Sequence, residues 1–320
     1  MAEMILPDDI DFGFYERETD AQQKVKPASM WVQELMDRMQ NPVKQKRSVM
    51  PWRKTHAQIQ FRPGEVTVWG GANGQGKSLV TGQVALSLCG QGEKVCIASF
   101  EMKPLKTLER MGRQWSAFNM NDPAFLGDER AMAQFVDLYG QFRDWTDGKL
   151  WLYDQQGTVT AKQVCAGARY CAKEKGITHF FIDSLMKCVS AEDDYNAQKM
   201  FVDELTAIAR DHSVHIHLIH HIKKPNDENH KPTKYDFKGT GAITDQVDNV
   251  IAVWRNKVKE KKRESNALVS DAEPDALLIC DKQRNGEWEG QIGLWFDRNS
   301  MQYVGNPGDE PLSLYKHAEH

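Results

Sequence analysis

The chain has 320 residues, of which 41 are Lys or Arg and 45 are Asp or Glu, so its formal net charge at pH 7 is −4. This balance argues against a protein that coats nucleic acid through a generally basic surface, although it leaves room for a local basic channel. The sequence shows no signal peptide and no apolar run approaching about 20 residues, and its 6 cysteines lack C-x-x-C spacing. We therefore expect a soluble cytoplasmic protein with reduced core cysteines, built as one large α/β domain with an extension or as two domains.

Residues 1–50 differ in character from the rest of the chain. An acidic stretch between residues 8 and 20 precedes Ser29, which could cap a helix from Met30 to Met39. Such a helix would carry Trp31, Leu35, Met36 and Met39 on one face. On its basic tether at 44–47, it could fold back on its own domain or dock on a neighbouring subunit. We assign residues 1–50 to an acidic arm and linker helix, 51–305 to the main domain, and 306–320 to a C-terminal tail.

Residues 71–78, Gly-Ala-Asn-Gly-Gln-Gly-Lys-Ser, fit the phosphate-binding pattern G-x-x-x-x-G-K-[ST]. A predicted buried strand at 65–69 precedes them and a predicted helix at 79–88 follows. Glycines let backbone N–H groups turn toward phosphates, and the helix adds the positive end of its dipole. Lys77 would reach the terminal phosphates, and the Ser78 hydroxyl would hold Mg²⁺. A chance glycine-rich turn is the alternative, but strand, loop and helix all occur in order. The predicted nucleoside triphosphate site comprises Gly71, Asn73, Gly74, Gln75, Gly76, Lys77, Ser78 and Leu79.

From residue 59 onward, strand-like and helix-like segments alternate. The pattern predicts further strands at 94–100, 149–153, 178–182, 214–219 and 276–281, and helices at 105–118, 131–145, 160–175 and 196–212. This alternation predicts an α/β fold with a mostly parallel central sheet that is covered by helices on both faces. Because ligands bind at the carboxyl ends of the strands in such sheets, polar residues that end a strand are candidate site residues.

Two strand ends carry carboxylates. Glu101 follows the strand at 94–100 and could polarise the water that attacks the γ-phosphate of a nucleotide. A helix-capping or solvated glutamate would look the same in the sequence. Asp183 ends the apolar run at 179–182 and is the usual second half of a phosphate-loop site, where the carboxylate holds the Mg²⁺ shell through water. Ser78 and Asp183 are therefore the predicted metal-site residues.

The strand at 214–219 leads into His220, His221 and a lysine-rich stretch that extends to residue 248. A polar group at this strand end could sense the γ-phosphate and pass the signal to the basic segment, although a lone histidine is more often structural. The stretch is typical of a long flexible loop with a shorter one at 238–241. Cationic loops with exposed N–H groups suit a phosphodiester backbone, but the composition also fits a solvated loop. The predicted nucleic-acid contacts are Lys223, Lys224, Lys231, Lys234, Lys238, Gly239 and Thr240.

Near the C-terminus, a strand ends in Lys282 and Arg284 and enters an Asn-Gly turn, which predicts a hairpin into a strand at 290–296. The turn would place the two cations at the tip of a protruding ribbon. There they could neutralise charge that develops on a phosphate bound to the adjacent subunit, although a plain surface pair is the alternative. The mixed charge run at 257–264 is interpreted as a surface turn or hairpin tip and not as a binding site.

In this order, the motifs resemble one family: the RecA-like motor domain of the hexameric replicative DNA helicases, which includes DnaB, Twinkle and the phage primase–helicases. The resemblance extends from residue 64 to about residue 303. It implies that Glu101 is the catalytic glutamate, that Asp183 is the metal-shell aspartate, and that Lys282 and Arg284 act on a neighbouring subunit's site.

The same resemblance covers the basic segment. Residues 219–225 look like the phage and Twinkle form, in which a histidine is the sensor; the alignment favours His221, with His220 as the fallback. Residues 236–243 are similar to the family's second DNA loop, with Lys238 where Arg is usual. No clear match exists for the base-stacking residues, and Arg255 and Phe296 are weak matches for adenine contacts.

The resemblance implies an ATPase (ATP or another NTP, with Mg²⁺) that forms a hexameric ring, moves on single-stranded DNA and unwinds forked duplex during replication. Residues 1–50 are too short for a primase domain or a DnaB-type N-terminal domain, so we expect help from a separate primase, loader or polymerase. A phage-encoded protein that acts in the host cytoplasm, without a membrane, fits this picture. Two other classes stay open: a RecA/RadA- or RepA-like DNA-stimulated ATPase of recombination or replication initiation without processive unwinding, and a non-translocating loader or scaffold.

Overall fold

The computed structural model describes residues 4–5, 27–40, 47–119, 122, 125, 127–155, 157, 159–189, 194–223, 227, 229–238 and 241–315. Three expectations fall outside these residues: the acidic stretch at 8–20, the tether at 44–46, and the nucleic-acid contacts assigned to Lys224, Gly239 and Thr240. None of the described helices combines the length and the apolar character that a membrane crossing requires.

A sheet of ten strands forms the centre of the described chain, in the order β1-β6-β5-β7-β8-β4-β9-β10-β11-β12. Neighbouring strands from β1 to β9 run parallel, and β10, β11 and β12 continue the sheet antiparallel. The strands are β1 (Met4–Ile5), β4 (Val66–Gly71), β5 (Val95–Ser99), β6 (Leu150–Tyr153), β7 (His179–Asp183), β8 (His215–His221), β9 (Asn249–Arg255), β10 (Ala276–Gln283), β11 (Gly290–Asp297) and β12 (Gln302–Val304). A separate pair joins β2 (Ser48–Val49) to β3 (Gln60–Phe61).

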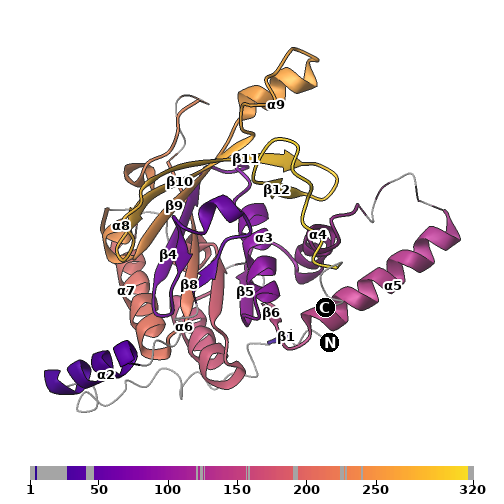
Figure 1. Ribbon diagram of the computed structural model, residues 1–320. Coiled ribbons are helices and arrows are strands. Elements are labelled where there is room, and N and C mark those ends of the chain that lie inside the picture. The colour runs from indigo at the N-terminus through magenta and orange to yellow at the C-terminus, as the bar shows by residue number, and fades with distance from the viewer. Residues whose placement is uncertain are drawn as a thin grey trace.

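Helices cover both faces of the sheet (Figure 1). They are α2 (Ala28–Gln40), α3 (Lys77–Gly90), α4 (Pro104–Ser116), α5 (Glu129–Thr146), α6 (Ala161–Tyr170), α7 (Tyr195–His212), α8 (Gly241–Gln246) and α9 (Lys257–Glu264), and α6 continues as a π-helix at Cys171–Lys175. One core lies between the sheet and α6, α7 and α8, and a second lies between the sheet and α3, α4 and α5. Along β4, Val66 and Val68 face the first core and Trp69 faces the second, because successive strand residues point to opposite faces.

The predicted fold class is confirmed. Each strand and helix predicted between residues 65 and 296 is present, with ends that differ by no more than two residues. All six cysteines are buried and free, as expected for reduced core residues. Two elements were not predicted: α8, which occupies part of the stretch expected to be loop, and β9, which lies beside β4 in the sheet.

The interpretation of 257–264 as a turn or hairpin tip is wrong, because these residues form α9. The Asn256 side chain caps this helix by accepting from the Lys259 backbone N–H at 2.9 Å. Glu260 in the first turn and Lys261, Lys262 and Arg263 in the last turn match the charge preference of the helix dipole. Mixed charge at helical spacing therefore stabilises a projecting helix here (Figure 1).

Three histidines lie buried side by side between the start of the sheet and the β2–β3 segment: His179, His215 and His217. The His179 and His217 ring nitrogens are 3.0 Å apart, and Trp69 Nε1 donates to His217 Nδ1 at 3.2 Å. His215 uses its two nitrogens on Thr67 Oγ1 (2.8 Å) and the Arg62 carbonyl (2.7 Å). Complete burial lowers the pKa of His215 to about 4 and holds the pKa of His217 well below its usual range. These residues are neutral parts of the core.

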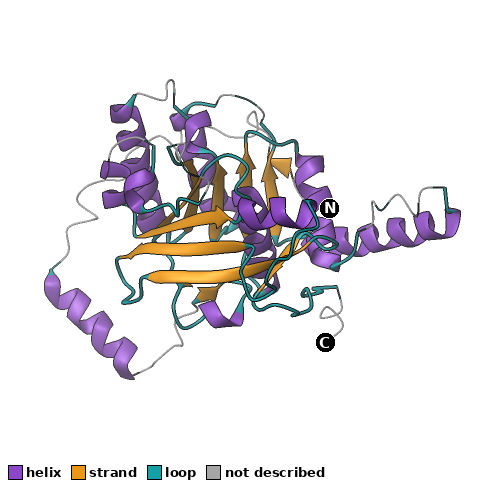
Figure 2. Cartoon of the chain, turned by 90° about the horizontal axis from the view of Figure 1, so that it is seen from above, coloured by secondary structure: helices purple, strands orange, loops and turns teal. Residues whose placement is uncertain are grey.

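The predicted N-terminal helix is present as α2 and stands away from the body of the molecule in both ribbon views (Figures 1 and 2). Its large apolar residues are between 46% and 74% exposed: Met30, Trp31, Val32, Leu35, Met36 and Met39. Helix α5 also projects from the body (Figure 2). Two projecting apolar elements therefore flank the sheet domain.

Candidate nucleotide-binding site

A cleft of ≈ 440 Å³ opens at the carboxyl ends of the parallel strands. Six of the residues predicted from the phosphate-binding pattern line it: Asn73, Gly74, Gly76, Lys77, Ser78 and Leu79. Glu101, Asp183 and His221 line the same cleft, and each follows or ends a different strand. The sheet topology explains this convergence, because β4, β5, β7 and β8 are parallel and end at one edge.

The loop between β4 and α3 has the geometry of a phosphate cradle. Gly74 and Gly76 have positive φ angles of 75° and 82°, which side chains rarely allow. Helix α3 begins at Lys77, so its free backbone N–H groups and dipole point at the cleft. Gly71 and Gln75 contribute from behind: the Gly71 carbonyl accepts from Lys77 Nζ at 2.8 Å, and the buried Gln75 side chain accepts from the Arg255 backbone N–H.

The Lys77 ammonium is folded back onto its own loop. It donates to the carbonyls of Gly71 and Ala72, at 2.8 and 3.1 Å, and its side chain is buried. Burial lowers the pKa of Lys77, while Asp183 and Glu101 act in the opposite direction. A cation held by two neutral carbonyls can turn to an anionic ligand, which binds an ammonium more strongly than a carbonyl does.

Ser78 and Asp183 form the candidate metal centre. Ser78 Oγ donates to Asp183 Oδ2 at 2.7 Å. Burial raises the pKa of Asp183, and the hydrogen bond from Ser78 opposes that shift. Among the described residues, no group of three or more His, Cys, Asp or Glu side chains could hold a metal by itself. A hydroxyl and one carboxylate at a phosphate cradle fit Mg²⁺, which takes oxygen ligands and is completed by phosphates and water.

Glu101 lies between Ser184 and His221 at the mouth of the cleft. Ser184 Oγ donates to Glu101 Oε1 at 3.3 Å, and His221 Nε2 is 3.8 Å from the same oxygen. His221, followed by weaker effects of Lys187 and Ser184, lowers the pKa of Glu101, although burial acts in the opposite direction. The alternative of a helix-capping glutamate does not apply, because the residue before α4 is Lys103 and its helix start has no side-chain cap.

The structure separates the two sensor candidates, His220 and His221. His221 Nδ1 lies 3.4 Å from Lys77 Nζ, so this ring bridges the phosphate loop and Glu101. His220 is fully buried and outside the cleft, where its Nε2 lies 2.7 Å from the Lys238 carbonyl. Because adjacent strand residues point to opposite faces, only one of the two can reach the nucleotide. That residue is His221.

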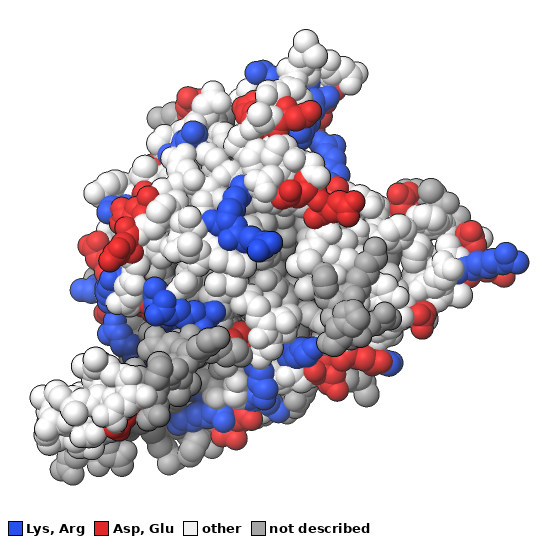
Figure 3. Space-filling view, viewed as in Figure 1, with Lys and Arg blue, Asp and Glu red and all other residues white. Residues whose placement is uncertain are grey.

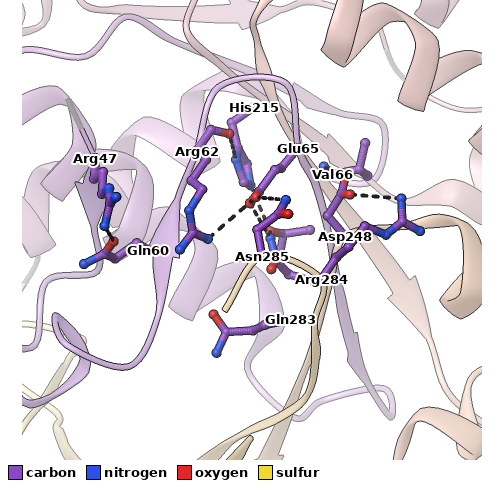
Figure 4. Close-up of polar contacts among 12 residues, drawn as sticks. Arg47, Gln60, Arg62, Glu65, Val66, His215, Asp248, Gln283, Arg284 and Asn285 are labelled. Carbon is purple, nitrogen blue, oxygen red and sulfur yellow. Dashed lines mark hydrogen bonds and ion pairs between the residues drawn. The ribbon is translucent and has the colours of Figure 1, made fainter. Parts of the chain in front are cut away.

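Lys282 and Arg284 lie at the opposite end of the sheet. Arg284 pairs with Asp248 at 3.3 Å, and Asp248 also accepts from the backbone N–H of Val66, the first residue of β4 (Figure 4). The phosphate loop starts at the other end of this strand, at Gly71. Five steps along a strand span roughly 17 Å. Arg284 is therefore too far from the cleft of its own chain.

The expectation of free cations at a ribbon tip is wrong. The connection from β10 to β11 folds back onto α8, and Lys282 Nζ donates to the Thr244 and Asp245 carbonyls at 2.8 Å each. Arg284 Nη2 donates to the Asp245 and Gln246 carbonyls at 3.1 and 3.2 Å. Both cations thus sit at the C-terminal end of a helix, where carbonyls are unpaired and the dipole is negative. The predicted hairpin itself is present.

The lysine-rich segment is tied down at both ends. Ile222 and Phe237 form a β-bridge, and the Lys223 backbone N–H donates to the Asp236 carbonyl at 2.7 Å. Lys231 Nζ lies 5.9 Å from the Trp254 ring centre, and the Lys234 backbone N–H donates to Asp281 at 2.6 Å. On the face in Figure 3, basic and acidic side chains alternate in small groups. The described part of this segment is more ordered than the predicted flexible loop.

Two cations at the cleft show how far sequence reasoning reached. Arg110, from α4, lines the cleft but was not predicted, because helical position alone does not distinguish it from a solvated arginine. Arg255, a weak match for an adenine contact, lines the cleft at the end of β9. Its guanidinium donates to the Gly74 carbonyl at 3.4 Å and pairs with Glu260 of α9. Phe296 lies behind the loop against Tyr303, with ring centres 5.0 Å apart.

Comparison with known sequences gives one family. The model of the DnaB-like helicase C terminal domain matches residues 57–305. A DNA helicase/primase of Enterobacteria phage T3 is 25% identical over 210 residues, which cover 61% of this chain and 36% of that protein. A replicative DNA helicase DnaB of Helicobacter pylori is 23% identical over 248 residues, which cover 72% of this chain and 50% of that protein. The matched segment thus spans a third to a half of these relatives.

Comparison with solved structures gives the same fold. The structure of an isolated ATPase domain matches with a TM-score of 0.72 and 15% identity, over 90% of this chain and 99% of that domain. A DnaB-like replicative helicase, solved for its interactions with primase, matches with a TM-score of 0.67 and 15% identity, over 88% of this chain and 67% of that one. At this identity the likeness concerns the fold.

Proposed function

Because this chain belongs to the family of DnaB-like helicase C-terminal domains, we propose that it is the ATP-driven motor of a replicative DNA helicase. The observation that carries the proposal is the placement of the candidate residues. Lys77, Ser78, Glu101, Asp183 and His221 meet in one cleft, whereas the Lys282–Arg284 pair lies at the other end of the sheet. Half of an ATPase site on each side of one domain is what a ring of identical subunits requires.

In this proposal the phosphate loop binds ATP or another nucleoside triphosphate. The backbone N–H groups at the start of α3 receive the phosphates, and Lys77 leaves its two carbonyl partners to contact them. Ser78 and Asp183 hold Mg²⁺, whose chemistry at such a site is to neutralise charge on the phosphates.

Glu101 orients the attacking water and accepts its proton. The lowered pKa of Glu101 keeps its carboxylate ionised at neutral pH, so it can accept a hydrogen bond from water. His221, between Lys77 and Glu101, responds to the terminal phosphate. Its neighbour His220 holds the carbonyl of Lys238, so a shift of β8 at the cleft moves the base of the basic segment.

The site is completed by a second copy of the chain. Arg284 and Lys282 face away from their own cleft by roughly the length of β4, so they can act only on a neighbour's nucleotide. Cations supplied in this way are worth on the order of 10³–10⁵ in turnover. To reach a phosphate, each must leave carbonyl partners on α8, which links catalysis to the position of that helix.

We assign the ring contact to α2 and the apolar side of α5. Helix α2 exposes six large apolar residues. An apolar cleft of ≈ 630 Å³ lies at α5, lined in part by Phe118, Phe125, Phe135 and Leu138. Helix α2 of one copy would cover this cleft on the next copy, which removes two exposed apolar surfaces from water. A ring of six is the assembly expected for the family.

The DNA contacts assigned to this motor are the lysines of the segment after β8: Lys223, Lys231, Lys234 and Lys238 among the described residues, with Lys224, Gly239 and Thr240. Because the net charge is −4 and charges alternate on the face in Figure 3, attraction to DNA has to come from this local segment. Residues 51–305 form the motor domain, 1–50 the arm and linker helix, and 306–320 a tail. The tail's Leu314 N–H donates to the Trp115 carbonyl of α4 at 2.9 Å.

An unwinding assay on 5′-tailed and 3′-tailed forked duplexes, run with native mass measurement, tests this function. We expect ATP-dependent strand separation on one of the two forks and a mass of six subunits. Helical filaments on single-stranded DNA in electron microscopy, without unwinding, would favour a RecA- or RepA-like ATPase instead. ATP binding with neither unwinding nor filaments would favour a loader or scaffold.

A further inference from the structure

A second, smaller cavity of ≈ 30 Å³ adjoins the candidate metal centre. It shares Ser78 and Asp183 with the nucleotide cleft, and its wall also contains Ser99 at the end of β5, Thr107 on α4 and Thr81 on α3. Four hydroxyl side chains and one carboxylate therefore surround a space that holds about one water molecule.

The four hydroxyls are not equivalent. Ser78 Oγ donates to Asp183 at 2.7 Å, and Thr81 Oγ1 donates to the Lys77 carbonyl at 3.1 Å. The hydroxyl oxygens of Ser99 and Thr107 are buried and have no hydrogen-bond partner among the residues that the structure describes, and each side chain is only 8% exposed. Buried hydroxyls in folded proteins nearly always have a partner, because leaving one unpaired is unfavourable.

We propose that Ser99 and Thr107 hold one water molecule in this cavity and that the water donates to the Asp183 carboxylate. The proposal rests on the assignment of Asp183 to the metal centre. Asp183 Oδ2 already accepts from Ser78, and a carboxylate has about four acceptor sites, so it can accept from a water as well. The water then has three polar partners, which is the usual number for a buried water.

The two hydroxyls are positioning residues in this account. They touch neither nucleotide nor metal, but the water between them fixes the direction of the Asp183 carboxylate. A buried carboxylate with only one donor could rotate, whereas one held from two sides keeps one oxygen aimed at the cleft. Ser99 and Thr107 come from β5 and α4, so the water also joins the sheet to the helix that follows Glu101.

The test uses Thr107→Val, which removes the hydroxyl at nearly constant shape, Ser99→Ala, and the double variant. Thr206→Val is the matched control, because Thr206 is equally buried on α7 and its hydroxyl donates to the Asp203 carbonyl at 2.7 Å. Thermal unfolding without nucleotide is measured first. Each single variant should lower the midpoint by roughly 2–4 °C, and the double variant by little more than one single variant, because both remove the same water.

Binding of a fluorescent ATP analogue is then titrated with Mg²⁺. The Ser99 and Thr107 variants should raise the Mg²⁺ concentration at half-saturation about tenfold, as loss of an outer-shell partner does, and leave binding without Mg²⁺ unchanged. The control should not alter the Mg²⁺ titration. An unchanged or raised unfolding midpoint for Thr107→Val, additive single effects, or a normal Mg²⁺ titration would each overturn the proposal. A wild-type chain that binds no nucleotide would instead refute the proposed function, since the unfolding experiment reports on the water without it.

Discussion

The buried histidines make the stability of this protein sensitive to acid, and His215 allows the effect to be calculated. Its pKa is lowered from 6.5 to about 4 by complete burial, with smaller opposing effects of the Arg62 carbonyl and Asp248. The unfolded chain therefore binds a proton at a higher pH than the folded chain. The contribution of His215 is fully present above pH 6.5 and is lost as the pH falls toward 4, which amounts to about 3 kcal/mol in total and about 2 kcal/mol by pH 5.

Urea unfolding of the wild type and of His215→Gln at pH 7.5, 6 and 5 tests this value. Glutamine can still bond to Thr67 and to the Arg62 carbonyl but does not titrate. The variant should therefore lose about 2 kcal/mol less stability than the wild type between pH 7.5 and pH 5. His230→Gln, which replaces a half-exposed histidine, is the control and should keep the wild-type loss. Equal losses for the wild type and His215→Gln would refute the reasoning.

Three further predictions concern the site. Glu101→Gln should leave nucleotide binding intact and lower the ATPase rate by roughly 10²–10⁴-fold; brisk hydrolysis by this variant in a steady-state assay would remove Glu101 from its role. Glu260→Gln should release Arg255 from its ion pair and raise the Kd for ATP several-fold, with the exposed Glu264→Gln on the same helix as a neutral control; equal Kd values for both variants would contradict this positioning role. Lys238→Ala should lower the salt dependence of single-stranded DNA binding by about one phosphate contact, and an unchanged slope in a salt titration would exclude that contact.

The fold was predictable because its signals are local and periodic. Strands that are buried on both faces read as apolar runs, and the amphipathic helices between them repeat at helical spacing. The segment after β8 was harder, since α8 has only six residues and β9 follows it without a turn signal. Helix α9 was missed because a charged run reads as solvated surface when its cap and dipole pairing are not considered.

The candidate site was predictable where chemistry and topology act together. A phosphate loop, Glu101 and Asp183 each follow or end a parallel strand, so the sheet itself brings them to one edge. Long-range contacts were not predictable. Neither the pairing of Arg284 with Asp248 nor the position of Arg110 in the cleft leaves a mark at fixed spacing. The choice between His220 and His221 needed the direction of each side chain from β8.

The central claim is that each ATPase site is shared by two copies of the chain, and mixed rings test it most directly. Lys77→Ala removes one half of the site and Arg284→Ala the other half, so each variant alone should be inactive. When the two are mixed in equal amounts, about a quarter of the interfaces should combine an intact Lys77 with an intact Arg284, and ATPase activity should reappear. Absence of any recovery in rings shown by mass to contain both variants would contradict the account.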